Sequence, residues 1–129
     1  MKTAKQFTVW GQNRPGNLAR ITRAMGDAKV NISGIVASEA RGRSPVRFIP
    51  DDAAKARAVF KELGLRFSEE TVLVLSLADK PGALARAAEK LAAARVNIDY
   101  GYATALPGAS RASIVLGVNN MARARLALR

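Results

Sequence analysis

One short pattern occurs twice in this chain of 129 residues. Residues 13–20 read NRPGNLAR and residues 79–86 read DKPGALAR, so the two segments lie 66 positions apart. At the same offset, residues 30–32 and 96–98 both read VNI. A third match, AKAR at 54–57 with ARAR at 122–125, has an offset of 68. The sequence therefore predicts a duplicated unit, with a two-residue insertion that we assign to the turn near Leu106, Pro107 and Gly108.

Each copy has the same predicted order of elements. Alternating apolar residues predict a strand near residues 7–11 and its counterpart at 71–77. The Pro-Gly corner ends each strand, and an apolar stripe at helical spacing follows it. The stripe residues are Leu18, Ile21, Met25 and Ala28 in copy one, and Leu84, Ala87, Leu91 and Ala94 in copy two.

Two strands and a second helix complete each copy. The expected hairpins are 32–40 with 45–49, turning at Arg41-Gly42, and 98–105 with 110–118, turning at Pro107-Gly108. Second helices are expected to start at 50–52 and 119–120, and Gly64 ends the first of them. The first copy then continues through 65–67 into the strand at 71–77.

This order, β-α-β-β-α-β, predicts an α+β fold of two ferredoxin-like units. Each unit is expected to have an antiparallel sheet with both helices on one face. We place the units at residues 1–69 and 70–129. The second copy ends before its last strand, and either a strand of copy one or a second chain could fill that edge, because a bare strand edge is a liability.

Composition narrows the chemistry that is available. The chain contains no Cys and no His, which removes thiolate metal sites and the commonest catalytic base. No apolar signal region or membrane-length apolar segment occurs, so we expect a cytoplasmic protein without a membrane partner. The net charge of +11 has three explanations: a solvated Arg-rich surface, a polyanionic partner such as nucleic acid, or an acidic protein partner.

Both copies resemble ACT domains. The resemblance rests on the Asp/Asn-x-Pro-Gly-x-Leu corner and the VNI segment at matched spacing, and it covers residues 6–128. It implies a tandem ACT pair that acts as an allosteric regulatory module. Such a module binds a small molecule, usually an amino acid, at an interface between ACT units, and associates through its sheets. We therefore expect a homodimer, and a regulated enzyme as a further partner.

The corners are the candidate ligand site. Backbone N–H groups in the first turn of each helix suit a carboxylate, and we assign this role to Asn17, Leu18, Ala83 and Leu84. Asp79 or Asn13 would accept from an ammonium group, and Asn31 and Asn97 would add an amide across the subunit interface. The predicted ligand-binding residues are Asn13, Pro15, Gly16, Asn17, Leu18, Asn31, Asp79, Pro81, Gly82, Ala83, Leu84 and Asn97.

Other interpretations remain open. Asp79 and Asn13 could simply cap their helices, and Asn31 and Asn97 could simply shape turns. Nucleic-acid binding on the sheet is the alternative function, although it needs exposed aromatic residues and the third strands offer only Phe48. We expect no enzymatic activity, no catalytic residues, no metal and no cofactor, because no pair of carboxylates has catalytic spacing and no glycine-rich phosphate loop occurs.

Overall fold

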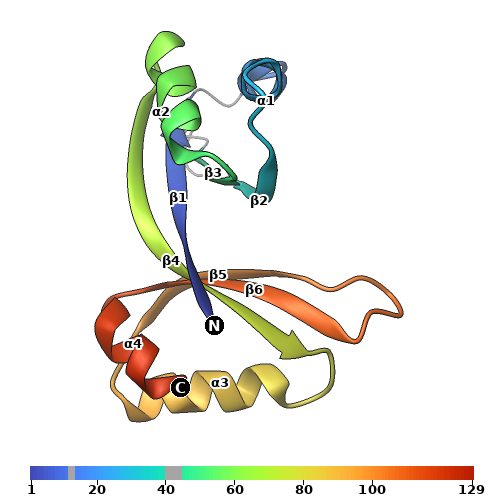
Figure 1. Cartoon of the computed structure of the whole chain (residues 1–129), viewed down its shortest axis with the longest axis vertical. Coiled ribbons are helices and arrows are strands. Elements are labelled where there is room, and N and C mark those ends of the chain that lie inside the picture. Colours follow the sequence, from blue (N-terminus) through green and yellow to red (C-terminus); the bar gives the residue numbers. More distant parts are fainter. Residues whose placement is uncertain (12–13, 40–44) are drawn as a thin grey trace. The chain divides into compact units, whose positions relative to one another are not determined.

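The computed structural model describes residues 1–11, 14–39 and 45–129. Within these residues, six strands and four helices follow the predicted order, with the pattern β-α-β-β-α-β present twice (Figure 1). The elements of the first half are β1 (Lys2–Trp10), α1 (Asn17–Asp27), β2 (Ile32–Ala37), β3 (Val46–Pro50) and α2 (Ala53–Glu62). Those that follow are β4 (Arg66–Ala78), α3 (Ala83–Ala93), β5 (Ile98–Thr104), β6 (Arg111–Val118) and α4 (Met121–Ala127).

The chain forms two compact units. The first unit comprises Lys5–Glu70, and the second comprises Met1–Ala4 together with Thr71–Arg129. Strands β1 and β4 each contribute residues to both units. In the first unit the strand order is β2-β3-β1-β4, and in the second it is β1-β4-β6-β5. The pairs β1–β3, β2–β3, β4–β6 and β5–β6 are all antiparallel.

The N-terminal residues supply the strand that the second copy lacks. Met1–Ala4 belong to the second unit, and β1 is the hydrogen-bonded neighbour of β4. Of the two sources considered for the open edge, a segment of the same chain therefore fills it. The first unit obtains its own last strand from the start of β4, which runs without a break from Arg66 to Ala78.

Aromatic rings fill the core of the first unit. Phe60 on α2 is fully buried, and its ring centroid lies 5.5 Å from that of Phe7 and 5.6 Å from that of Phe67. Phe48 on β3 stacks against Phe60 at 6.0 Å. Ile21 and Met25 of α1 join the same cluster. Both helices of the first unit therefore pack on one face of its strands.

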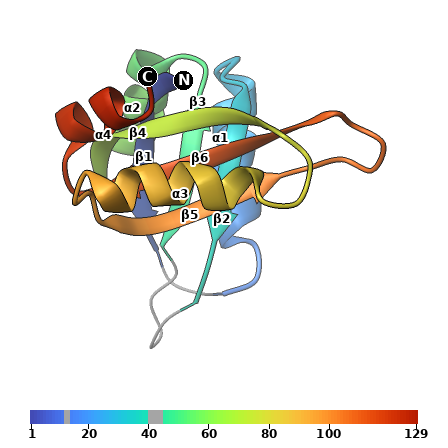
Figure 2. The same ribbon diagram turned by 90° about the horizontal axis from the view of Figure 1, so that it is seen from below.

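The second unit has a smaller, aliphatic core. Leu73 and Leu75 of β4 pack with Leu91 of α3, Leu116 of β6 and Ala124 of α4. Figures 1 and 2 show α3 and α4 on the same face of strands β4, β5 and β6. The predicted helix-on-one-face arrangement is thus confirmed in both units.

The helix stripes were predicted correctly except at their first positions. Leu18 is 40% exposed and Leu84 is 51% exposed, so neither belongs to a core. Each lies in the first turn of its helix, whereas the buried residues are Ile21 and Met25 in α1 and Ala87 and Leu91 in α3. The inward face starts one turn later than the sequence pattern indicated.

The ends of the helices explain most of the observed boundaries. Asp52 caps α2 by accepting from the Lys55 N–H at 3.0 Å, and Asn120 caps α4 by accepting from the Arg123 N–H at 2.9 Å. Gly64 follows α2 with a φ of 68°, as expected for a C-terminal glycine. Residue 40 and the turn predicted at Arg41-Gly42 lie outside the described residues.

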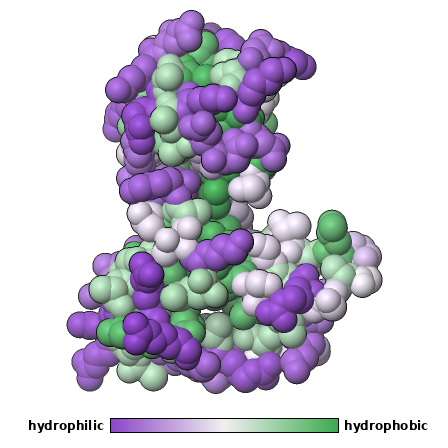
Figure 3. Space-filling view, viewed as in Figure 1, coloured by the Kyte–Doolittle hydropathy of each residue, from purple (hydrophilic) through white to green (hydrophobic). Residues whose placement is uncertain are grey.

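The surface around α1 and α2 is largely hydrophilic in the view of Figure 3, which agrees with the abundance of Arg and Lys. Within the described parts of the chain, no helix has the length and apolar character needed to cross a membrane.

Candidate functional site

The two Pro-Gly corners have nearly identical backbone geometry. Gly16 has φ 88° and ψ −12°, and Gly82 has φ 87° and ψ −11°. These values suit the third residue of a type II turn, a position that favours glycine, with proline before it. The turn closes when the Asn17 N–H donates to the Arg14 carbonyl at 3.2 Å, and the Ala83 N–H to the Lys80 carbonyl at 3.3 Å.

This turn changes which backbone donors are available. The N–H groups of Asn17 and Ala83 were predicted to be unpaired, but both close their turns. In the second unit, the Arg86 N–H donates to the Gly82 carbonyl at 3.0 Å. The donors that lack a backbone partner in this described stretch are therefore those of Leu84 and Ala85, one residue further along than predicted.

Asp79 does not cap α3. The N-cap is Gly82, and no side chain accepts a hydrogen bond there. The backbone N–H of Asp79 donates to the Ser110 carbonyl at 3.0 Å, which fixes the corner to the start of β6, and the residue is exposed. The capping interpretation is thus wrong for Asp79. Asn13 lies outside the described residues.

The two VNI asparagines lie away from the corners of their own units. Asn31 and Asn97 follow the C-terminal ends of α1 and α3, whereas the corners precede the N-terminal ends. An eleven-residue helix is about 16 Å long. The Asn97 N–H donates to Asn119 Oδ1 at 2.9 Å, and its Nδ2 donates to Asp99 Oδ1 at 2.8 Å. No single unit brings a corner and its asparagine together.

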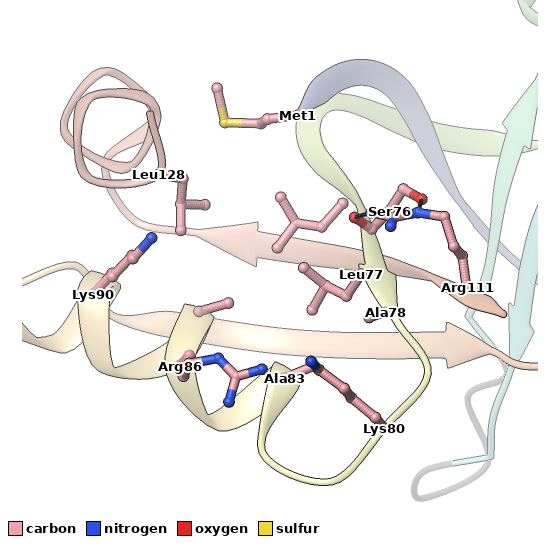
Figure 4. A pocket seen from close by; sticks show the side chains of 12 residues that line it. Met1, Ser76, Leu77, Ala78, Lys80, Ala83, Arg86, Lys90, Arg111 and Leu128 are labelled. Atoms are coloured by element: carbon pink, nitrogen blue, oxygen red, sulfur yellow. Dashed lines mark hydrogen bonds between the residues drawn. The ribbon is translucent and has the colours of Figure 1, made fainter.

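A pocket of about 440 Å³ adjoins the corner of the second unit (Figure 4). Its lining residues come from β4, α3 and β6, from the segment before α3, and from the two ends of the chain, at Met1 and Leu128. Of the predicted ligand-binding residues that the structure describes, Ala83 alone is among the lining residues. They are Met1, Leu75, Ser76, Leu77, Ala78, Lys80, Ala83, Arg86, Ala87, Lys90, Arg111 and Leu128.

The charge of this pocket is one-sided. Its lining includes the four cations Lys80, Arg86, Lys90 and Arg111 and no carboxylate. Within the part of the chain that the structure describes, none of the four forms an ion pair. Arg111 is held in place because its Nε donates to Ser76 Oγ at 2.8 Å and its Nη2 to the Ser76 carbonyl at 2.6 Å. The pocket therefore presents an unneutralised positive lining.

The corresponding place in the first unit is filled. There, Asn17 Nδ2 lies only 2.7 Å from the position that a Cβ on Gly11 would take, so the side chain of Asn17 occupies the space over Gly11. Ile21 is also buried. At the same offset of 66, the second unit has Ala83 in place of Asn17 and Ala87 in place of Ile21. Two side chains of α3 are therefore smaller than their counterparts on α1, whereas β4 has Leu77, which lines the pocket, at the position of Gly11.

Sequence reasoning missed the cationic residues because charged side chains are usually solvated. One feature of the sequence could have indicated them. Arg86 and Lys90 are four residues apart on α3, and like charges at this spacing destabilise a helix, so the pair has a cost that a binding role would explain. The corner of the first unit has a more open hollow, to which Gly16 contributes with Ala19, Arg20, Thr22 and Arg23. Among the described residues, no three carboxylates lie close enough to hold a metal ion.

Solved structures of other proteins share this architecture. The structure is similar to that of protein BT0572 from Bacteroides thetaiotaomicron, with 28% identity, a TM-score of 0.91, and coverage of 98% of this chain and 86% of that one. It also has the fold of the regulatory subunit of aspartate kinase from Thermus thermophilus, at 16% identity, a TM-score of 0.71 and coverage of 100% and 94%. The corresponding subunit from Thermus flavus gives 17% identity, with the same TM-score and coverage.

A search of curated proteins finds no matching sequence. The ACT domain pair family matches residues 2–128, which is almost the full length of the chain. Members of this family are typically regulatory, ligand-binding modules. The chain belongs to the ACT domain pair family.

Proposed function

We propose that this ACT pair is a regulatory module that binds an amino acid at the Pro-Gly corner of its second unit, where that corner meets an ACT unit of a second copy. The observation that carries the proposal is the start of α3, where two unpaired backbone donors adjoin a pocket with a cationic lining. The first unit has the same turn, but its corresponding space is filled by Asn17.

Each part of an amino acid has a partner in this proposal. The α-carboxylate accepts from the N–H groups of Leu84 and Ala85, where the positive end of the helix dipole favours an anion. The α-ammonium pairs with the exposed carboxylate of Asp79. Because Asn31 and Asn97 lie at the far ends of their own helices, we assign the amide contact to an asparagine of the second copy.

Ligand binding acts by favouring one arrangement of the copies. A ligand shifts such an equilibrium only by its difference in affinity for the two arrangements. The output therefore passes through the oligomer or through a partner enzyme, as in the aspartate kinase regulatory subunits that share this fold.

The nucleic-acid alternative has little structural support. Recognition on a ferredoxin-like sheet requires exposed aromatic residues that stack on bases. Phe48, the one aromatic residue in the two third strands, is fully buried in the first core. Without an exposed aromatic residue on the third strands, the positive charge supports non-specific, salt-sensitive binding.

A thermal-shift screen of the twenty amino acids tests the proposal. A ligand at 100 times its Kd stabilises the protein by roughly 2.7 kcal/mol. The variant Asp79→Asn, which gives the second corner the residue of the first, is expected to reduce the shift. Glu89→Gln on the same helix is the matched control. Analytical ultracentrifugation with each amino acid shows whether the ligand changes the association of the copies. If no amino acid stabilises the protein or changes its sedimentation coefficient, the proposal is wrong.

A further inference from the structure

We infer that the ligand of the second unit carries two carboxylates on a short carbon chain and lies in the pocket beside α3. This inference rests on the proposed function and specifies the chemical class of its ligand. Either an acidic amino acid or a simple dicarboxylate has this chemistry.

The charge of the lining selects for more than one negative group. Four cations face the pocket without a lining carboxylate, and no described ion pair neutralises them. A neutral zwitterion brings one carboxylate and one ammonium, so its net charge does not compensate this lining. A ligand with a second carboxylate compensates it better, because each carboxylate can then lie close to a cation.

The cations are spread along the pocket, which favours an extended ligand. Ala83 begins α3 and Lys90 lies two turns later, about 10 Å along the helix axis. Figure 4 shows Lys90 beside Leu128 toward one end of the pocket, and Lys80 and Arg111 toward the other. A ligand with a negative group at each end can meet cations toward both ends of the pocket, whereas a single carboxylate or an inorganic phosphate has only one negative group.

Apolar side chains share the lining with the cations. Leu75, Leu77, Ala87 and Leu128 lie among the residues that form it. This surface suits the methylene groups of a short carbon chain, which gain free energy when they leave water. The pocket thus combines several cations with an apolar surface, as expected for a dicarboxylate.

One end of the pocket is held in position before any ligand arrives. Arg111 makes two hydrogen bonds to Ser76, at 2.8 and 2.6 Å, and these use only its Nε and Nη2 atoms. Its guanidinium presents five N–H donors, so donors remain for a carboxylate. A side chain that is already ordered loses less entropy on binding.

Isothermal titration calorimetry on the full chain tests the inference. The panel contains aspartate, glutamate, succinate and glutarate, with asparagine, glutamine, butyrate and inorganic phosphate as controls. We expect at least one dicarboxylate compound to bind tenfold more tightly than its amide or monocarboxylate counterpart. Glutamate against glutarate, and aspartate against succinate, distinguish the amino acid from the simple dicarboxylate as the source.

The outcomes separate this inference from the proposed function. If glutamine or asparagine binds as tightly as its acid, the inference is overturned and amino-acid binding stands. Equal binding of inorganic phosphate also overturns the inference, because phosphate lacks the carbon chain. If no compound in the panel binds and the twenty-amino-acid screen is also negative, both proposals are overturned.

Two variants locate the bound ligand. Ala87→Ile introduces the residue that fills the first unit at the matched position, and it is expected to reduce affinity at least tenfold; Ala92→Ile on the exposed side of α3 is its control. Should Ala87→Ile fail to fold, the exposed Lys90→Gln is expected to weaken binding threefold to tenfold, whereas Lys55→Gln leaves it unchanged. Unchanged affinity in a folded Ala87→Ile or Lys90→Gln protein contradicts the placement.

Discussion

The guanidinium of Arg111 is fixed to Ser76 across the β4–β6 pair, through 2.8 Å to the side-chain oxygen and 2.6 Å to the backbone carbonyl. Both residues line the pocket of the second unit. Ser76 therefore holds the guanidinium of Arg111 in one orientation at the pocket, and under the proposed function it would act on a ligand through Arg111.

Ser76→Ala tests this positioning role. The substitution removes one hydrogen bond to Arg111 and leaves the charge of the pocket unchanged. Affinity for the dicarboxylate ligand is expected to fall by roughly threefold to tenfold, about 1 kcal/mol. Arg111→Ala removes the cation itself and should cost more. Calorimetric titration of both variants compares the two losses of affinity. A larger loss of affinity in Ser76→Ala than in Arg111→Ala would contradict the positioning role of Ser76.

The turn geometry predicts opposite effects for two glycines of the first unit. Gly16 has a φ of 88° in open space, so an added Cβ meets no neighbour and Gly16→Ala measures backbone strain alone. It is expected to lower the free energy of unfolding by about 1–2 kcal/mol. Gly26 lies inside α1, also in open space, and Gly26→Ala should raise it by about 0.5–1 kcal/mol.

Denaturant titrations of the two variants provide the measurement. The comparison is internally controlled, since both substitutions add the same methyl group to the same unit without a steric contact. Equal effects of the same sign would show that the positive φ of the corner is not a constraint.

An ion pair in the first unit predicts a pH dependence. Arg57 donates to Glu69 from Nε at 2.7 Å and from Nη2 at 2.8 Å, and these hydrogen bonds hold the pKa of Glu69 below its ordinary value of 4.5. Because the folded pKa is lowered, the stabilisation is fully present above pH of about 4.5 and is lost as pH falls through the folded pKa.

Glu69→Gln therefore should reduce stability near neutral pH, and its difference from the wild type should shrink below pH of about 4.5. Denaturant unfolding at pH 7, 5, 4 and 3 measures the difference, with Glu62→Gln as a matched control on the neighbouring helix. A gap between wild type and Glu69→Gln that stays constant across this range argues against the assignment.

The duplication made the fold predictable. The matched NRPG and DKPG corners, the two VNI segments and the caps at Asp52 and Asn120 all correspond to local backbone geometry, which short sequence patterns encode well. The position of the N-terminal strand was harder to predict from the sequence. Residues 1–4 alternate weakly, and their membership of the second unit depends on long-range pairing with β4.

The candidate site was predictable only in part. The corner turns were recognisable, but the side chains around them were not. In the sequence, Arg86 and Lys90 look like ordinary solvated residues of a basic chain. The sequence also gives no sign of the pocket that they line. Ala83 and Ala87 line the same pocket, and only the comparison with Asn17 and Ile21 at the matched positions of the other unit shows that both are small.

The central claim is that the second unit, and not the first, binds the ligand. Arg20 and Arg86 occupy matched positions on α1 and α3, and both are exposed, so Arg20→Glu and Arg86→Glu change the charge identically. The decisive measurement is the Kd of the tightest-binding panel compound for the two variants and the wild type. The account predicts a loss of more than tenfold in Arg86→Glu and a change of less than threefold in Arg20→Glu; equal losses, or a larger loss in Arg20→Glu, would contradict it.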